Sequence, residues 1–225
     1  MDLSSQIQTA LYQQGFEFNC KFEAAFGELT IICAAEHILD LLAVLKNYQG
    51  LKFDTLIDLC AVDYLLFGKS EWETNFVDGS SYSRGVEASS QQLHPDFPSR
   101  FAVVYHLLST SVNQRCRVKV FLDETRPVIA SATSLWNAAN WFEREAYDLY
   151  GILFHGHDDL RRLLTDYGFI GHPFRKDFPL SGHVEMRYDA TLQRVVYEPV
   201  EIEPRVLVPK VVREDNRYLG EKEGY

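Results

Sequence analysis

Apolar residues in the first fifty positions follow two different repeats, which predict helices and strands in turn. Residues 3–14 and 36–48 place apolar side chains on one helical face, and a glycine suited to ending a helix lies just beyond each segment. Between them, residues 16–22 alternate apolar and polar positions, and residues 29–34 form an apolar run of β type. We expect a helix, a two-stranded hairpin turning at residues 25–27, and a second helix.

Three later segments have strand character. Residues 51–66 are apolar but interrupted by acids, so we expect only part of this segment to pair, with its acids toward an edge or loop. Residues 101–109 and 115–122 predict an antiparallel pair turning at residues 110–114. His106 lies inside this pair and is interpreted as a hydrogen-bonded sheet residue, because no second metal ligand lies at a matching spacing.

The clearest helical pattern comes next, with apolar residues at steps of four and three positions: Leu135, Ala139, Phe142, Ala146 and Leu149. We predict a helix that Thr133 or Ser134 caps and that Gly151 ends. Four charged residues lie off the apolar stripe: Glu143, Arg144, Glu145 and Asp148. They are consistent with a solvated helix face, on which Arg144 and Asp148 can pair.

The remaining pattern is less regular. Residues 152–154 predict a short strand, residues 158–164 a short helical segment, and residues 166–173 a series of turns. Prolines then recur every five residues at 199, 204 and 209, which opposes both helix and central strand. From about Val195 we expect an extended arm that lies along a partner.

Together these elements predict an α+β fold: a two-layer domain with a mixed, largely antiparallel sheet packed against helices, plus an extended C-terminal tail. We assign residues 1–180 to the core domain, with a long polar insertion at about residues 68–100. Residues 181–225 form the predicted partner-binding tail.

Composition and charge narrow the possible partners. The chain of 225 residues has 46% hydrophobic and 24% charged residues, which is ordinary for a globular protein. Its formal net charge of -10 would repel a phosphate backbone, so nucleic acid is excluded as an expected partner. Without an apolar run of about 20 residues or a targeting segment, we expect the chain to stay in the cytoplasm and to meet a membrane only through a partner.

The sequence gives only weak signals for catalytic or metal-binding residues. The four cysteines are far apart and form no CxxC motif, which favours reduced, buried thiols: Cys20, Cys33, Cys60 and Cys116. His155, His157 and His172 lie among acids, so a metal-dependent hydrolase stays open, although HExxH is lacking. No GxGxxG, GxxxxGK[ST] or GxSxG motif occurs. We assign no catalytic, cofactor-binding or metal-binding residue to this chain.

Residues 141–179 concentrate acids, bases, histidines and glycines, and admit three interpretations: a solvated face, a polar active site or a surface that docks onto another protein. The segment also carries a series of motifs, namely Glu143-Arg144-Glu145 with Asp148, Leu160-Arg161-Arg162, Thr165 to Phe169, Gly171-His172-Pro173 and Arg175 to Pro179. This series closely resembles the signature of the C-type subunit family of NADH-quinone oxidoreductase, the thirty-kilodalton subunit of respiratory complex I.

The resemblance extends over about residues 55–205, and includes VVYHLLS at 103–109, RVKVF at 117–121 and VVYEPVE at 195–201. One departure is local: His157-Asp158-Asp159 stands where the family usually has His-Pro-Asp before Leu-Arg-Arg. The difference affects only the expected turn at this point.

The resemblance implies a non-catalytic core subunit of the peripheral arm of a proton-pumping NADH-quinone oxidoreductase. FMN and iron-sulfur clusters in neighbouring subunits would carry electrons from NADH to quinone, and this chain would bind no cofactor. Its implied partners are other peripheral-arm subunits, chiefly the quinone-site subunit of D type and its iron-sulfur neighbour. The implied location is the cytoplasmic side of the cell inner membrane, held there through the complex.

Ten charged residues carry the signature and the implied subunit interface: Glu143, Arg144, Glu145, Asp148, Arg161, Arg162, Asp166, Arg175, Lys176 and Asp177. We expect them to form hydrogen-bonded ion pairs within the domain or across to a partner. Two alternatives remain open. One is a free-standing metal-dependent hydrolase using His155 and His157, and the other is the equivalent subunit of a related membrane-bound hydrogenase or photosynthetic-type complex.

Overall fold

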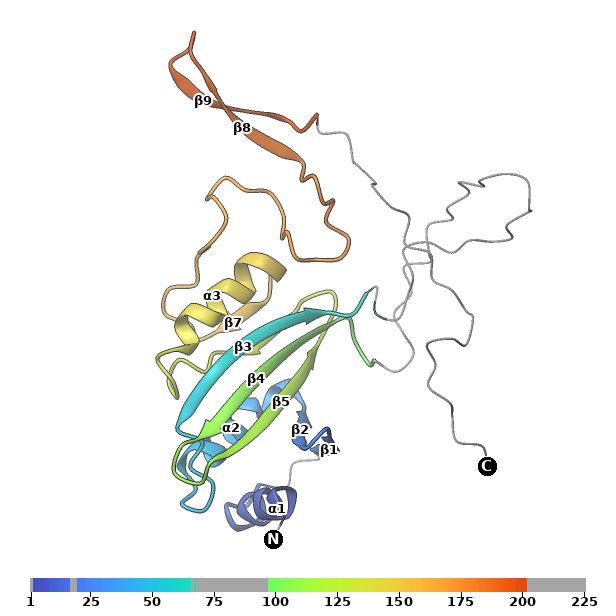
Figure 1. The fold of residues 1–225 in the computed structure, drawn as a ribbon, viewed down its shortest axis with the longest axis vertical. Helices are drawn as coiled ribbons and strands as arrows, with labels where there is room; N and C mark the ends of the chain where they lie inside the picture. Colours follow the sequence, from blue (N-terminus) through green and yellow to red (C-terminus); the bar gives the residue numbers. More distant parts are fainter. Residues whose placement is uncertain (1, 17–19, 66, 68–96, 202–225) are drawn as a thin grey trace, which may run out of the picture.

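A five-stranded mixed sheet lies at the centre of the computed structural model, which describes residues 2–16, 20–65, 67 and 97–201 (Figure 1). Its order is β1-β2-β5-β4-β3, with bounds Lys21–Ala25, Glu28–Cys33, Gln114–Leu122, Phe101–Ser109 and Thr55–Asp63. Only the β2–β5 pairing is parallel. The predicted α+β class with a mixed, largely antiparallel sheet is confirmed, as are the two predicted hairpins, although β1 begins at Lys21 and not at residue 16.

Helices α1 (Leu3–Gln13) and α2 (Ile38–Asn47) cover one face of this sheet, with the short 3-10 turn η1 (Ala35–His37) leading into α2. The helices bury their apolar stripes against alternate strand residues such as Ile31, Tyr105 and Val118, none of which is exposed. Strand β4 is buried along most of its length, as its continuous apolar sequence predicts. The periodicities therefore located these elements correctly.

Helix α3 (Ala139–Tyr150) lies beside the edge strand β3 (Figure 1). Strands β6 (Val128–Ala130) and β7 (Leu153–His155) flank it in sequence and pair in parallel. The helix ends at Gly151 as predicted, but it begins at Ala139 and has no side-chain cap. The predicted caps were wrong because residues 132–136 form a turn of their own, with the Trp136 N–H bonded to the Ala132 carbonyl at 3.0 Å.

Two further predictions differ from the structure. Residues 158–164 form no helix, because the amide groups at 163–165 bind a side chain of α3 instead of a preceding carbonyl. Near the C-terminus, β8 (Val184–Asp189) and β9 (Arg194–Pro199) form an antiparallel hairpin that projects from the sheet domain (Figure 1). The segment after Val195 is extended as expected, but it pairs with β8 of the same chain as far as Pro199. The insertion at 68–96 and the tail beyond 201 lie outside the described residues.

Candidate functional site

The charged motifs lie on α3 and on the segment between β7 and β8, residues 156–183, which we call the signature loop. This loop contains no helix or strand, yet it is packed against the polar side of α3. A loop of this length without regular structure needs side chains to bind its backbone groups, since buried amides must be paired. Those side chains come from α3.

Asp148 is the main anchor of the signature loop. Its side chain is fully buried and accepts hydrogen bonds from the backbone N–H groups of 163, 164 and 165, at 3.0, 2.7 and 2.8 Å. The Thr165 hydroxyl also donates to it, and Arg162 forms an ion pair with it at 2.9 Å. Burial raises the pKa of Asp148, but these hydrogen bonds outweigh it and hold the pKa well below the usual value.

Two arginines bind backbone carbonyl groups of the loop. The buried Arg144 guanidinium donates to the carbonyls of 161 and 162 at 3.3 and 3.4 Å and stacks over the Trp141 ring. Arg162 donates across the loop to the Gly171 carbonyl at 3.1 Å. Arg144 and Asp148 therefore do not pair with each other as expected, because each binds a different stretch of the loop.

The loop in turn completes the C-terminus of α3. The last carbonyls of a helix lack intrahelical donors. Here the carbonyl of Asp148 lies 2.9 Å from Nδ1 of His172, the carbonyl of Leu149 accepts from the Phe174 N–H at 3.1 Å, and the carbonyl of Tyr150 accepts from Nε of Arg175 at 2.6 Å. Helix and loop thus form one hydrogen-bonded unit.

Gly151 allows this close approach. Its φ of 76° is in the left-handed region, and a Cβ there would lie 2.5 Å from Nε2 of His172 and 2.6 Å from a terminal nitrogen of Arg175. We expect Gly151→Ala to destabilise the chain by about 2–4 kcal/mol, measured by urea unfolding. Gly156→Ala is the matched control, because Gly156 has a similar φ of 86° and open space around it. Equal losses for the two variants would contradict the role of crowding.

Glu143 binds on the other side of α3. It is fully buried and accepts from the Ser131 hydroxyl and the Ala132 N–H, both at 2.6 Å, so it fixes the turn that precedes the helix. Burial raises its pKa. Of the three interpretations, the solvated face is therefore wrong for Glu143, Arg144 and Asp148. Hydrophobic periodicity cannot identify a face that buries polar groups against a polar loop.

A second ion cluster ties the loop to the sheet. Arg100 contacts both carboxylate oxygens of Asp63 at 2.9 and 2.8 Å, and it also pairs with Asp177 at 2.9 Å. Asp63 further accepts from the backbone N–H of Lys176 at 2.8 Å. Sequence reasoning missed Asp63 and Arg100. The available signal was their position at the facing ends of β3 and β4, where Asp63 lies opposite Phe101.

The other predicted residues are more exposed. Arg161 pairs with Asp159 at the surface at 2.8 Å, and Asp166 accepts from the Tyr197 hydroxyl of the hairpin at 2.8 Å. Glu145 is half-buried, and Lys176 is an exposed residue whose backbone, not its side chain, makes the contact with Asp63. The signature is thus divided between buried or half-buried groups that hold α3 and the loop together and four exposed residues: Arg161, Asp166, Lys176 and Asp177.

Large apolar residues are also exposed on this unit. Those on the loop are Leu164, Tyr167, Ile170, Phe174 and Leu180. On the hairpin, the register places a second set on one face, which we call the apolar hairpin face: Val184, Met186, Tyr188, Val195 and Tyr197. These five side chains belong to residues that are 42–62% exposed. The hydrogen bond from the Tyr197 hydroxyl to Asp166 joins the hairpin to the loop.

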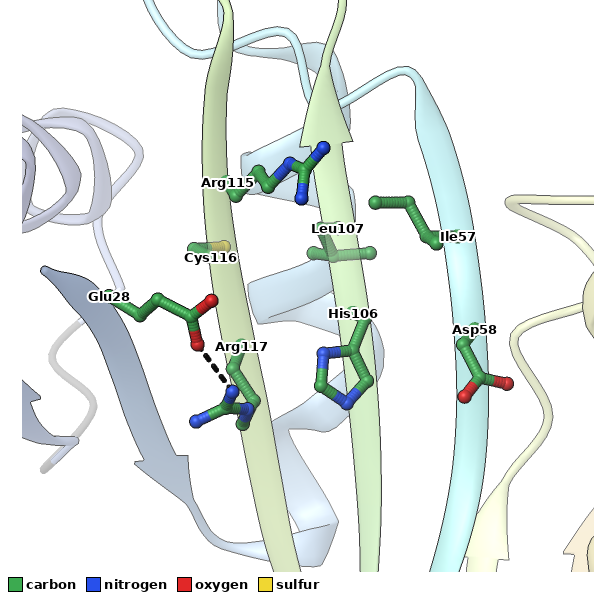
Figure 2. A pocket seen from close by; sticks show the side chains of 8 residues that line it. All are labelled: Glu28, Ile57, Asp58, His106, Leu107, Arg115, Cys116 and Arg117. Carbon is green, nitrogen blue, oxygen red and sulfur yellow. Dashed lines mark hydrogen bonds and ion pairs between the residues drawn. The ribbon is translucent and has the colours of Figure 1, made fainter. Parts of the chain in front are cut away.

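A separate cavity of about 280 Å³ lies on the sheet (Figure 2). His106 stands there in a row between Asp58 and Arg117, and Arg117 turns away to pair with Glu28 at 2.5 Å. Burial and the nearby Arg117 charge lower the pKa of His106. The cavity is lined by none of the signature residues.

The histidines proposed for a hydrolase are placed differently. His155 is in β7, whereas His157 accepts from the Asp159 N–H through Nδ1 at 3.0 Å and lies 3.3 Å from the Asn140 carbonyl through Nε2. Both ring nitrogens of His157 are thus engaged. Within the described ranges, no group of three or more His, Cys, Asp or Glu residues could hold a metal ion, and no helix there is long and apolar enough to cross a membrane.

Comparison with known proteins matches residues 31–184 to the family model described as "Respiratory-chain NADH dehydrogenase, 30 Kd subunit". Three curated relatives are each named as the C-type subunit of NADH-quinone oxidoreductase. The relative from Legionella pneumophila strain Corby is 59% identical over 88% of this chain and 87% of its own. That from Hydrogenovibrio crunogenus is 54% identical over 96% of both chains, and that from Coxiella burnetii strain Dugway 5J108-111 is 51% identical over 97% and 99%.

Two solved structures are also similar. A trypsin-resistant fragment of Nqo5 is 28% identical, with a TM-score of 0.49 over 71% of this chain and 100% of that one. A chain of the membrane-bound sulfane sulfur reductase, an archaeal respiratory membrane complex, is 18% identical, with a TM-score of 0.52 over 79% and 85%, and shares the fold. The family model and the curated relatives agree across most of the chain, which therefore belongs to the family of the 30 kDa subunit of respiratory-chain NADH dehydrogenase.

Proposed function

We propose that this chain is a non-catalytic core subunit of the peripheral arm of an NADH-quinone oxidoreductase, and that it joins neighbouring subunits. The observation that carries the proposal is the apolar hairpin face. A lone two-stranded hairpin is marginally stable in water, and apolar residues of this size are rarely left together in solvent. A partner that covers this face would stabilise the hairpin and bury the adjoining loop residues.

The charged signature then acts mainly inside the subunit. Its buried members hold the signature loop in one conformation, so the loop presents apolar residues without a large ordering cost on binding. The partners we propose are the quinone-site subunit of D type and its iron-sulfur neighbour. Electrons would pass from NADH through FMN and iron-sulfur clusters in those neighbouring subunits to quinone, and the assembly would lie on the cytoplasmic side of the inner membrane and pump protons.

The alternative functions have less support. Curated relatives more than half identical are named for NADH-quinone oxidoreductase, so the interpretation as a hydrogenase subunit is weaker. The hydrolase interpretation relied on His155, His157 and nearby acids, and both ring nitrogens of His157 face other groups.

We expect the double variant Met186→Glu/Val195→Glu to lose association with the other peripheral-arm subunits. Each new carboxylate would be buried without a partner in the interface, which costs several kcal/mol, so recovery of the partners should fall by more than about tenfold. The measurement is co-purification with the tagged full chain from its own cells, together with NADH-quinone turnover of the membranes.

Arg194→Glu provides the matched control, because it changes the net charge by the same amount on the polar face of the same hairpin. It should co-purify normally. A thermal melt of each isolated chain checks that both variants fold. If the double variant assembles and turns over like the unmodified chain, the apolar hairpin face is not the docking surface.

A further inference from the structure

Two cysteines distant in sequence face each other at the edge of the sheet. Strands β1 and β2 pair antiparallel, with Lys21 opposite Ile32 and Phe22 opposite Ile31. Continuing this register by one residue places Cys20 opposite Cys33. Because side chains alternate along a strand, both thiols lie on the side of Phe22 and Ile31, which packs against the core. The Cys33 thiol donates a hydrogen bond to the Ala34 carbonyl at 3.3 Å.

This position suits a disulfide. Residues directly opposite in an antiparallel pair have Cα atoms about 4.5 or 5.5 Å apart, and disulfides bridge Cα separations of about 4.4–6.8 Å. Strand β1 is an edge strand and mostly exposed, so it can adjust without moving the core. Both cysteines are free thiols in this structure.

The two thiols have different environments, which assigns them different roles. The adjacent Cys33 side chain lowers the pKa of Cys20, which is half-buried and therefore open to a small reagent. The same contact with Cys20, together with burial, raises the pKa of Cys33 well above its usual range. Cys20 is therefore the group that attacks first, since the thiolate is the nucleophile.

We propose that Cys20 and Cys33 form a redox-active dithiol pair, which a low-molecular-weight disulfide oxidises to an intramolecular disulfide. The Cys20 thiolate attacks one sulfur of the reagent, forms a mixed disulfide and expels the first reagent thiolate. The Cys33 sulfur then attacks the Cys20 sulfur, loses its proton and expels the second. The protein loses two protons and two electrons, and the reagent takes them up and leaves as two thiols. This reaction is independent of the proposed docking function.

The other two cysteines are internal controls. In the sheet register Cys60 lies opposite Val104, and Cys116 lies opposite Leu107 and Leu29, so neither faces another cysteine. Burial raises the pKa of both thiols, to about 12 for Cys116. Neither should respond as the pair does.

The test is to treat the folded full chain with oxidised glutathione, titrate its free thiols and map disulfides by mass spectrometry without reduction. We expect two of the four thiols to be lost, with a peptide linkage between Cys20 and Cys33 that dithiothreitol reverses. Cys33→Ser should stop at a mixed disulfide on Cys20, Cys20→Ser should leave Cys33 unmodified, and Cys60→Ser should still form the linkage.

Retention of all four thiols would overturn the proposal, as would modification of Cys60 or Cys116 while Cys20 and Cys33 stay reduced. A Cys33→Ser variant that gains no glutathione on Cys20 would overturn the assigned order of attack. Melting curves of the reduced and oxidised chains check that the reaction takes place on the folded protein.

Discussion

Replacing Asp148 by asparagine is expected to destabilise the full chain by about 2–4 kcal/mol and to loosen the signature loop. The carboxylate accepts from three backbone N–H groups, a hydroxyl and a guanidinium. An asparagine keeps one acceptor oxygen, but it turns an NH₂ group toward donors and leaves Arg162 without its ion pair. Urea unfolding gives the loss of stability, and hydrogen exchange at the amides of 163–165 should speed up most.

Asp158→Asn is the control for this variant, because Asp158 is an exposed carboxylate in the same loop. It should leave stability and exchange unchanged. The pH dependence supplies a second check. Because the folded pKa of Asp148 is depressed, its contribution is present above the ordinary value of 3.8 and is lost as pH falls through the folded pKa. Equal exchange at 163–165 in the wild type and Asp148→Asn would show that Asp148 does not hold the loop.

The sequence predicted the parts of the fold that depend on local periodicity. Strands β4 and β5 and helix α2 were located because their apolar repeats match their own geometry. The start of α3 was misplaced, since Glu143 and Ser131 fix a turn before it and this contact is not visible in the repeat. Strand β8 was missed because its apolar residues are exposed and form no part of the core.

The sequence predicted where the candidate site lies, but not which of its charged groups are buried. The density of opposite charges indicated residues 141–179, but it could not show that Glu143, Arg144 and Asp148 are buried and bind backbone groups. Its partners lie 14–17 residues along the chain, beyond the three- and four-residue steps that helical patterns compare. The pairing of Asp63 with Arg100 spans 37 residues, and only the strand register brings the two together.

Replacing Arg100 by methionine is expected to cost about 3–5 kcal/mol at neutral pH, because it leaves the buried Asp63 carboxylate without a cation. The Arg100 side chain is 9% exposed and that of Asp63 is fully buried. Methionine keeps an apolar stem of similar length, although it loses the guanidinium that lies 4.7 Å from the centroid of the Phe101 ring. Arg161→Met is the control, since Arg161 pairs with Asp159 at the surface, with both side chains more than half exposed. It should leave stability unchanged.

The pH dependence of this loss has a defined sign. In the wild type, burial raises the pKa of Asp63, but the bonds from Arg100 and from two backbone N–H groups outweigh it and hold the pKa below 3.8. Without Arg100, burial is opposed by two backbone bonds and the more distant Arg175 charge, and we expect the folded pKa to rise above the unfolded value. The folded variant then binds a proton more readily than its unfolded chain, and its stability relative to wild type should recover as pH falls from 7 to about 4.5.

The double variant Asp63→Asn/Arg100→Met separates the charge effect from lost packing. It should be more stable at neutral pH than Arg100→Met alone, because no buried carboxylate remains uncompensated, and its difference from wild type should change little between pH 7 and about 4.5. A double variant that loses the sum of both single losses, or an Arg100→Met loss that does not vary over this range, would mean that Asp63 is not the group that Arg100 neutralises. The link between the signature loop and β3 would then depend on the backbone contact from Lys176 to Asp63.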